Sequence, residues 1–101
     1  MIPTNEIAIR PAQLPDLDQL ESLEQRCFDY DQLTRRNFQW MLTKAKASLL
    51  VADYMGKILG YVLVLYHSGT SLARLYSMAV DSENRGLGLG KRLLMVAEDA
   101  A

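Results

Sequence analysis

The sequence has little of what marks secreted, disulfide-bonded or membrane-spanning chains. Its 101 residues include one cysteine, Cys27, so no internal disulfide can form and a reducing compartment is expected. The longest apolar run, Ile58 to Tyr66, is interrupted by Gly60 and is less than half of a bilayer span. Residues 1–6 show no basic region followed by an apolar stretch, so we expect no signal peptide and a cytoplasmic location.

An excess of one charge and a set of metal ligands are absent as well. The 11 basic and 12 acidic residues give a formal net charge of -1, which argues against a nucleic-acid partner. His67 is the one histidine and has no second ligand nearby, so we expect no metal site. Half of the residues are hydrophobic and 23% are charged, which predicts a single folded domain over residues 1–101 and no membrane partner.

The spacing of apolar residues predicts a layered α/β (α+β) fold. A period of two indicates strands and a period of 3.6 indicates helices. The expected order is a strand at Glu6–Arg10, helices at Asp16–Phe28 and Thr34–Lys46, strands at Ser48–Tyr54, Ile58–Tyr66 and Leu72–Val80, and a helix that begins within Gly88–Gly90. The three consecutive strands form an antiparallel meander, because short turns connect them.

Several side chains carry more specific expectations. Cys27 shares one face of the first helix with Leu17, Leu20 and Leu23, so it is interpreted as a core residue and not as a nucleophile. Thr34 is the expected N-cap of the second helix. Gly60 predicts a β-bulge or a close backbone approach. Phe38 and Trp40 are expected to be core or sheet-packing residues. The four tyrosines Tyr54, Tyr61, Tyr66 and Tyr76 are expected to pack on the strands, and one of them lining an acceptor pocket is the other interpretation.

The predicted strands are apolar enough to require packing partners on both faces of the sheet. The two strands within Ile58 to Val80 read as buried, and such a sheet normally needs cover on both faces. We therefore expect either a truncated domain whose C-terminal strands are missing or a second copy that completes the sheet as a homodimer.

Three alternating glycines lie between the last predicted strand and the last helix. The segment Arg85-Gly86-Leu87-Gly88-Leu89-Gly90-Lys91-Arg92 combines an unshielded backbone, the amides of a helix start and three basic residues. This combination predicts a phosphate or pyrophosphate site. A glycine-rich turn without a ligand is the alternative interpretation.

The segment differs from two well-known phosphate loops. A P-loop requires glycine where Arg85 stands and serine or threonine where Arg92 stands. A dinucleotide fingerprint that starts at Gly86 requires glycine or alanine where Lys91 stands, and an acid about 20 residues farther on. Both assignments are therefore rejected.

The sequence from Leu75 to Leu94 resembles the acetyl-CoA site of the GNAT N-acetyltransferases. That family's signature is Arg or Gln, two residues, Gly, one residue, and Gly or Ala, and here Arg85, Gly88 and Gly90 meet it. The strand that ends in Ala79-Val80-Asp81 and the opening Ile9-Arg10-Pro11-Ala12 also look like those of the family. Among its subfamilies, the ribosomal-protein alanine N-acetyltransferases look nearest.

The resemblance implies a binding site for acetyl-CoA as co-substrate. The loop amides would hold the diphosphate, the preceding strand would pair with the pantetheine arm, and an amide near Val80 would stabilise the developing oxyanion. The implied cofactor-binding residues are Met78, Ala79, Val80, Arg85, Gly86, Leu87, Gly88, Leu89, Gly90 and Lys91. An amine would attack the thioester directly in a ternary complex. The family's general base and acid lie on later elements, so the catalytic residues are unknown.

Two other functions stay open beside N-acetyl transfer. A non-catalytic CoA-binding or regulatory module, completed by a partner or a second copy, would keep the same loop. A generic phosphate-binding domain would prefer ligands such as ATP. The acceptor amine, a small molecule or a protein N-terminus, is not identified; acidic Asp29 and Asp31 would favour a cationic amine if they border its site, and a polar loop is the other interpretation.

Overall fold

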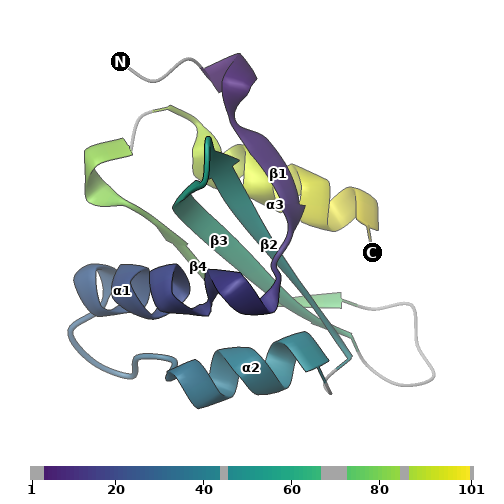
Figure 1. Cartoon of the computed structure of the whole chain (residues 1–101). Coiled ribbons are helices and arrows are strands. Elements are labelled where there is room, and N and C mark those ends of the chain that lie inside the picture. The colour runs from purple at the N-terminus through teal and green to yellow at the C-terminus, as the bar shows by residue number, and fades with distance from the viewer. Residues whose placement is uncertain (1–3, 44–45, 67–72, 85–86, 101) are drawn as a thin grey trace.

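The computed structural model describes residues 4–43, 46–66, 73–84 and 87–100, and it has four strands and three α-helices over them (Figure 1). In chain order these are β1 (Ala8–Pro11), α1 (Leu17–Cys27), α2 (Arg35–Thr43), β2 (Ala47–Tyr54), β3 (Lys57–Tyr66), β4 (Ala73–Val80) and α3 (Leu89–Ala100). Short 3-10 turns occupy Thr4–Glu6, Leu14–Asp16 and Ser82–Asn84. The predicted element order is confirmed; His67 and the turn predicted around it lie outside the described residues.

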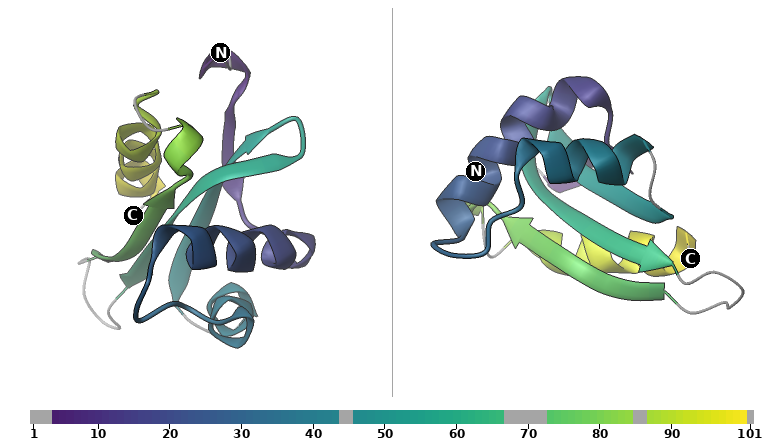
Figure 2. Two further views of the ribbon diagram at one scale, coloured as in Figure 1. Left: turned by 90° about the vertical axis from the view of Figure 1, so that its left-hand side faces the viewer. Right: turned by 90° about the horizontal axis from the view of Figure 1, so that it is seen from below.

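The four strands form one antiparallel sheet in the order β1-β2-β3-β4. Helices α1 and α2 cover one face and α3 covers the other, so the sheet is the middle layer of three (Figure 2). Among the described residues β4 pairs with β3 alone, which makes it an edge strand. The mixed α/β fold with an antiparallel meander agrees with the prediction.

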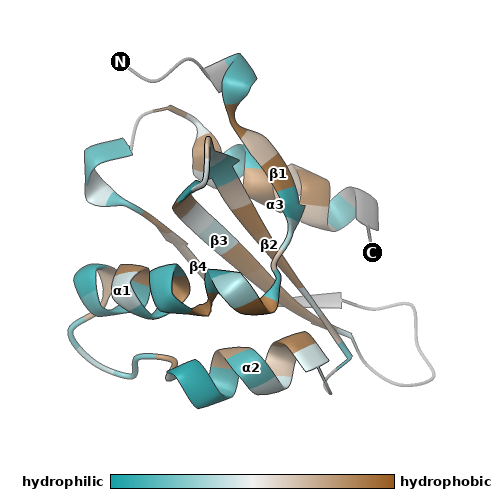
Figure 3. Ribbon diagram, viewed as in Figure 1, coloured by the Kyte–Doolittle hydropathy of each residue, from teal (hydrophilic) through white to brown (hydrophobic). Residues whose placement is uncertain are grey.

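The central strand β3 explains why both faces need cover. Its residues from Ile58 to Val64 are all buried, and much of its ribbon is coloured as hydrophobic (Figure 3). Tyr61 and Leu63 pack with α1 and α2, whereas Leu59 and Val62 pack with α3. A strand that is buried on both faces is apolar throughout and does not alternate, because neither of its faces is exposed to solvent.

Helix starts follow the local chemistry of the sequence. The Thr34 hydroxyl accepts a hydrogen bond from the Asn37 amide at 3.1 Å, which confirms Thr34 as the cap of α2. Before α1, Arg10 bridges two carboxylates: its guanidinium donates to Asp16 at 2.8 Å and to Asp53 at 3.0 Å. These ion pairs connect β1 to β2 and to the start of α1.

Two irregularities shape the strands that lead to the pocket described below. The register of β2 against β3 shifts between Ala52 and Asp53, opposite Gly60 and Ile58, which leaves Leu59 as the extra residue of a bulge. A Cβ atom at Gly60 would lie 2.8 Å from the Ala79 carbonyl oxygen on β4. Both readings of Gly60, a bulge beside it and a close backbone approach, are therefore confirmed.

Three sequence-based expectations are wrong. Trp40 and Tyr76 were expected to pack against the core or the sheet but are exposed by 52% and 51%, Trp40 because it lies on the outer side of α2. The period of two that predicted a strand at Leu72–Val80 fails near Tyr76, because the register of β4 with β3 shifts between Ser77 and Leu75 and leaves Tyr76 as an inserted residue. No helix in the described ranges is long and apolar enough to cross a membrane.

Candidate functional site

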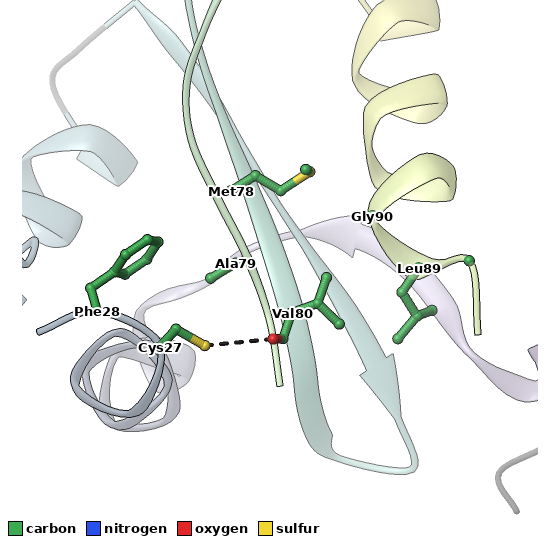
Figure 4. A pocket seen from close by; sticks show the side chains of 8 residues that line it. Cys27, Phe28, Met78, Ala79, Val80, Leu89 and Gly90 are labelled. Atoms are coloured by element: carbon green, nitrogen blue, oxygen red, sulfur yellow. Dashed lines mark hydrogen bonds between the residues drawn. The ribbon is translucent and has the colours of Figure 1, made fainter. Parts of the chain in front are cut away.

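A pocket of about 590 Å³ lies where the end of β4, the start of α3 and the end of α1 meet (Figure 4). Its volume falls within the range of about 300–1,000 Å³ that is usual for small-molecule and cofactor sites. Eight residues line it: Cys27, Phe28, Met78, Ala79, Val80, Gly88, Leu89 and Gly90. The lining is mainly apolar, so polar recognition depends on main-chain groups.

The main chain of β4 presents alternate residues to the open edge of the sheet. The Asp81 amide donates to the Leu59 carbonyl on β3 at 2.8 Å, and Ala79 is opposite Tyr61. Because successive amide and carbonyl groups point to opposite sides of a strand, those of Met78 and Val80 face away from β3. The Cys27 thiol donates to the Val80 carbonyl at 3.5 Å, which fits this orientation (Figure 4).

The first turn of α3 forms the opposite wall. The Arg92 amide donates to the Gly88 carbonyl at 3.0 Å, so Gly88 is the N-cap residue. Its φ of 73° lies in the left-handed region, which glycine adopts without strain. The amides of Leu89, Gly90 and Lys91 have no carbonyl acceptor within the helix, because they lie in its first turn. The helix dipole adds partial positive charge there.

The first turn of α3 packs against side chains of β4. A Cβ atom at Gly90 would lie 3.6 Å from Met78 Cε and 3.9 Å from Val80 Cγ2. Leu89 and Leu93 are buried against the α3 side of the sheet. The helix start is therefore held beside the strand edge, and the two sets of main-chain groups face one pocket.

The charged side chains near the pocket differ in exposure and in their partners. Lys91 is exposed on the first turn of α3, whereas the guanidinium of Arg92 donates to the Ile7 carbonyl at 3.0 Å. Asp81 follows Val80, is 2% exposed, and is paired with Arg26 at 2.5 Å. This pairing offsets a negative charge that would otherwise repel an anion at the end of β4.

Two carboxyl groups in ion pairs have shifted pKa values. Burial alone would raise the pKa of Asp81, but hydrogen bonds from Arg26 and from the Glu83 amide lower it overall. The hydrogen bond from Arg10 lowers the pKa of Asp16, against a smaller effect of burial. Both side chains are therefore stabilised as carboxylates in the folded protein.

A buried carboxyl group on α1 connects this helix to β3 and to the segment before α2. Glu24, which is 1% exposed in the last turns of α1, accepts the Tyr61 hydroxyl of β3 at 2.6 Å and the Leu33 amide at 2.7 Å. The Tyr61 hydroxyl also lies 2.8 Å from Ser77 Oγ on β4. Burial, followed by the hydrogen bond to Glu24, raises the pKa of Tyr61, so the phenol stays protonated.

The structure brings together most of the residues that the sequence singles out. Met78, Ala79, Val80, Gly88, Leu89 and Gly90 all line the pocket. Lys91 is exposed beside it, and Leu87 is half-buried against the α3 side of the core. Arg85 and Gly86 lie outside the described residues. The cofactor-binding role of these ten residues stays a prediction.

Other residues of the site were not selected from the sequence. Phe28 was missed, and Cys27, which packs against the core as expected, is half-buried and also lines the pocket. Glu24 was overlooked although it follows Leu20 by four residues on the apolar face of α1, where a charged residue signals a specific partner. Within the described ranges, no group of three or more His, Cys, Asp or Glu could hold a metal ion.

Comparisons with known proteins agree with this arrangement. Residues 14–101 match the Acetyltransferase (GNAT) family. An N-terminal acetyltransferase complex ARD1 subunit homolog of Dictyostelium discoideum is 27% identical over 95 residues, which is 93% of this chain and 47% of that protein. The chain thus spans about half the length of this relative.

Solved structures show the same fold. The GphF GNAT-like decarboxylase in complex with isobutyryl-CoA superposes with a TM-score of 0.80 at 23% identity, over 93% of this chain and 58% of that chain. The ribosomal-protein-S18-alanine N-acetyltransferase from Escherichia coli superposes with a TM-score of 0.80 at 21% identity, over 93% and 58% of the two chains.

Proposed function

Because the chain belongs to the GNAT acetyltransferase family, we propose that its pocket binds acetyl-CoA and that the acetyl group is transferred to a primary amine. One observation carries the proposal: the edge of β4 and the first turn of α3 face a single pocket of about 590 Å³. An extended arm can pair with the strand edge while a phosphate meets the helix start.

The helix start is suited to the diphosphate of CoA. The amides of Leu89, Gly90 and Lys91 have no intrahelical partner, and Gly88 and Gly90 have no side chains that would cover them. Lys91 adds a formal positive charge at the rim. The pairing of Asp81 with Arg26 reduces repulsion from the strand end.

The strand edge is suited to the pantetheine arm. The amide and carbonyl of Met78 face away from β3, so they can exchange hydrogen bonds with the amides of the arm in the manner of an added strand. This placement holds the thioester beside β4, where a neutral amine attacks its carbonyl carbon and the C–S bond breaks. The proton that the nitrogen loses balances the CoA thiolate, so CoA is released as the thiol. No acyl-enzyme forms, so positioning of the two reactants supplies much of the rate.

A matched pair of substitutions at Gly88 tests the diphosphate site. Asparagine and aspartate both tolerate a left-handed φ and both cap helices, but aspartate adds a negative charge where the diphosphate would bind. We expect Gly88→Asp to weaken CoA binding about tenfold or more relative to Gly88→Asn, with an equal or higher melting temperature. Isothermal titration calorimetry with CoA and thermal unfolding measure the two quantities.

Gly56 supplies the control for charge alone. It has a φ of 94° in the turn between β2 and β3, away from the pocket residues, so Gly56→Asp should leave CoA affinity unchanged. Equal CoA affinities for Gly88→Asp and Gly88→Asn would contradict the diphosphate site. Tighter binding of ATP than of CoA would favour a generic phosphate-binding domain.

A non-catalytic CoA-binding module is the second candidate. It is favoured by the position of β4 at the sheet edge, because among the described residues no further strand lies beside β4 to enclose the arm from the other side. Thiol release from acetyl-CoA with a panel of primary amines separates the two candidates. Binding of CoA without thiol release would support the module.

A further inference from the structure

We propose that Ser77 Oγ accepts a hydrogen bond from the N–H of the acceptor amine, and that Tyr61 and Glu24 orient it to do so. This inference rests on the proposed acetyl transfer and assigns a positioning system to its amine side. It is carried by the chain of hydrogen bonds from Ser77 through Tyr61 to Glu24.

The donor and acceptor roles in this series of hydrogen bonds are fixed at its buried end, at Glu24. Both carboxylate oxygens of Glu24 are acceptors: Oε1 receives the Tyr61 hydroxyl at 2.6 Å and Oε2 receives the Leu33 amide at 2.7 Å. A phenol has one proton, and here it is directed to Glu24. In the contact of 2.8 Å between Tyr61 and Ser77, the Tyr61 oxygen must therefore accept and the Ser77 hydroxyl must donate.

The same reasoning determines what Ser77 can offer to a ligand. The Ser77 hydroxyl donates its single proton to Tyr61, so Ser77 Oγ can take part in a further hydrogen bond only as an acceptor. Ser77 is half-buried, whereas Glu24 and Tyr61 are buried. An oriented acceptor at this position selects a ligand that carries a donor, and an attacking primary amine carries N–H groups.

The network is rigid enough to position a reactant. The Tyr61 ring packs edge-on against Phe38, with ring centroids 5.4 Å apart and planes at 89°. Glu24 also fixes the segment after α1 through the Leu33 amide. Ser77 and Ala79 share the α1 side of β4, and Ala79 lines the pocket, so the oriented hydroxyl lies one strand repeat from a residue of the pocket wall.

The sheet contains a matched pair that serves as a control. Ser48 Oγ on β2 and the Tyr66 hydroxyl on β3 lie 2.6 Å apart and are also partly buried, but neither residue lies on β4, the strand that lines the pocket. Loss of a serine hydroxyl at either place removes one serine–tyrosine hydrogen bond between strands. A purely structural role for Ser77 therefore predicts the same consequences for Ser77→Ala and Ser48→Ala.

The test measures acetyl transfer to n-butylamine and the Kd for CoA in the 101-residue chain. We expect Ser77→Ala to lower kcat/KM for the amine about tenfold or more, with the Kd for CoA changed less than about twofold. Ser77→Thr keeps the hydroxyl and should recover kcat/KM to within about threefold of the wild type. Ser48→Ala should leave kcat/KM unchanged; an equal kcat/KM for Ser77→Ala and the wild type would overturn the inference.

A binding measurement separates failure of this inference from failure of the proposed function. In the presence of CoA, NMR titrations compare n-butylammonium with N,N,N-trimethylbutylammonium, which has the same charge but no N–H donor. We expect the wild type to prefer n-butylammonium and Ser77→Ala to lose that preference. Absence of thiol release from the wild type would overturn acetyl transfer, whereas absence of the preference would overturn the role of Ser77.

Discussion

At the residue scale, two buried aspartates determine how the fold responds to acid. Asp16 and Asp81 are 6% and 2% exposed, and each is paired with an arginine. The folded pKa of each lies below the unfolded value of about 3.9, so both stabilise the fold above that pH. Their contribution is lost as the pH falls from about 4 through the lower folded pKa values.

We therefore predict that the free energy of unfolding falls when the pH is lowered below about 4. In the double variant Asp16→Asn, Asp81→Asn, we expect a loss of about 1–3 kcal/mol per site at neutral pH and a shallower decline in acid. Urea denaturation between about pH 3 and pH 7 measures both effects. Asp29→Asn is the control, because Asp29 is exposed; an unchanged acid slope in the double variant would contradict the prediction.

At the element scale, the spacing between strands and α3 depends on two glycines with different surroundings. A Cβ atom at Gly60 would meet the Ala79 carbonyl oxygen at 2.8 Å, which would force β3 and β4 apart. A Cβ atom at Gly90 would make ordinary contacts, the nearest at 3.6 Å with the flexible end of Met78. The same substitution should thus have opposite effects at the two positions.

We predict that Gly60→Ala lowers the free energy of unfolding by about 1–3 kcal/mol, because its neighbours are backbone and closely packed side chains. Gly90→Ala should raise it by up to about 1 kcal/mol, since alanine favours the helix. Chemical denaturation of the two variants measures this contrast. A Gly60→Ala variant as stable as the wild type would show that β4 can move without cost.

The sequence predicted most elements but not the contacts between them. The periods of Leu17, Leu20 and Leu23 and of the apolar run from Ile58 place α1 and β3 to within one residue, because both elements bury apolar surface. The register shift at Tyr76 depends on pairing with β3, which no local pattern records. The partners of Glu24 come from residues 9 and 37 positions away, so its role required the fold.

Part of the candidate site could be predicted from the sequence, and part of it depends on the fold. The glycines and the strand before them form a continuous motif, so the sequence alone could indicate that β4 and the start of α3 belong together. Cys27 at the end of α1 and the next residue, Phe28, form another wall some 50 residues earlier in the chain, and only packing brings it to the pocket. The exposure of Trp40 was missed because the prediction relied on the hydrophobicity of the residue, which does not tell which face of the helix it occupies.

At the scale of the whole molecule, apolar side chains remain exposed on the edge strand β4 and on α3. Leu75 and Tyr76 on β4 are exposed by 46% and 51%, and Met95 and Val96 on α3 by 54% and 37%. An edge strand with unpaired main-chain groups and apolar neighbours is a template for pairing with another chain. The 101-residue chain should therefore associate with itself as its concentration rises.

We predict that the weight-average mass of the chain increases with concentration and that the double variant Leu75→Lys, Tyr76→Lys suppresses the increase, since charged residues on an edge strand oppose pairing. Light scattering and sedimentation velocity measure the mass. Trp40→Lys is the matched control: Trp40 is equally exposed, but α2 packs on α1 and β2, away from β4. Loss of association in Trp40→Lys, with association retained in the β4 variant, would place the contact on the helical face, because only the side chains at the true interface are desolvated there.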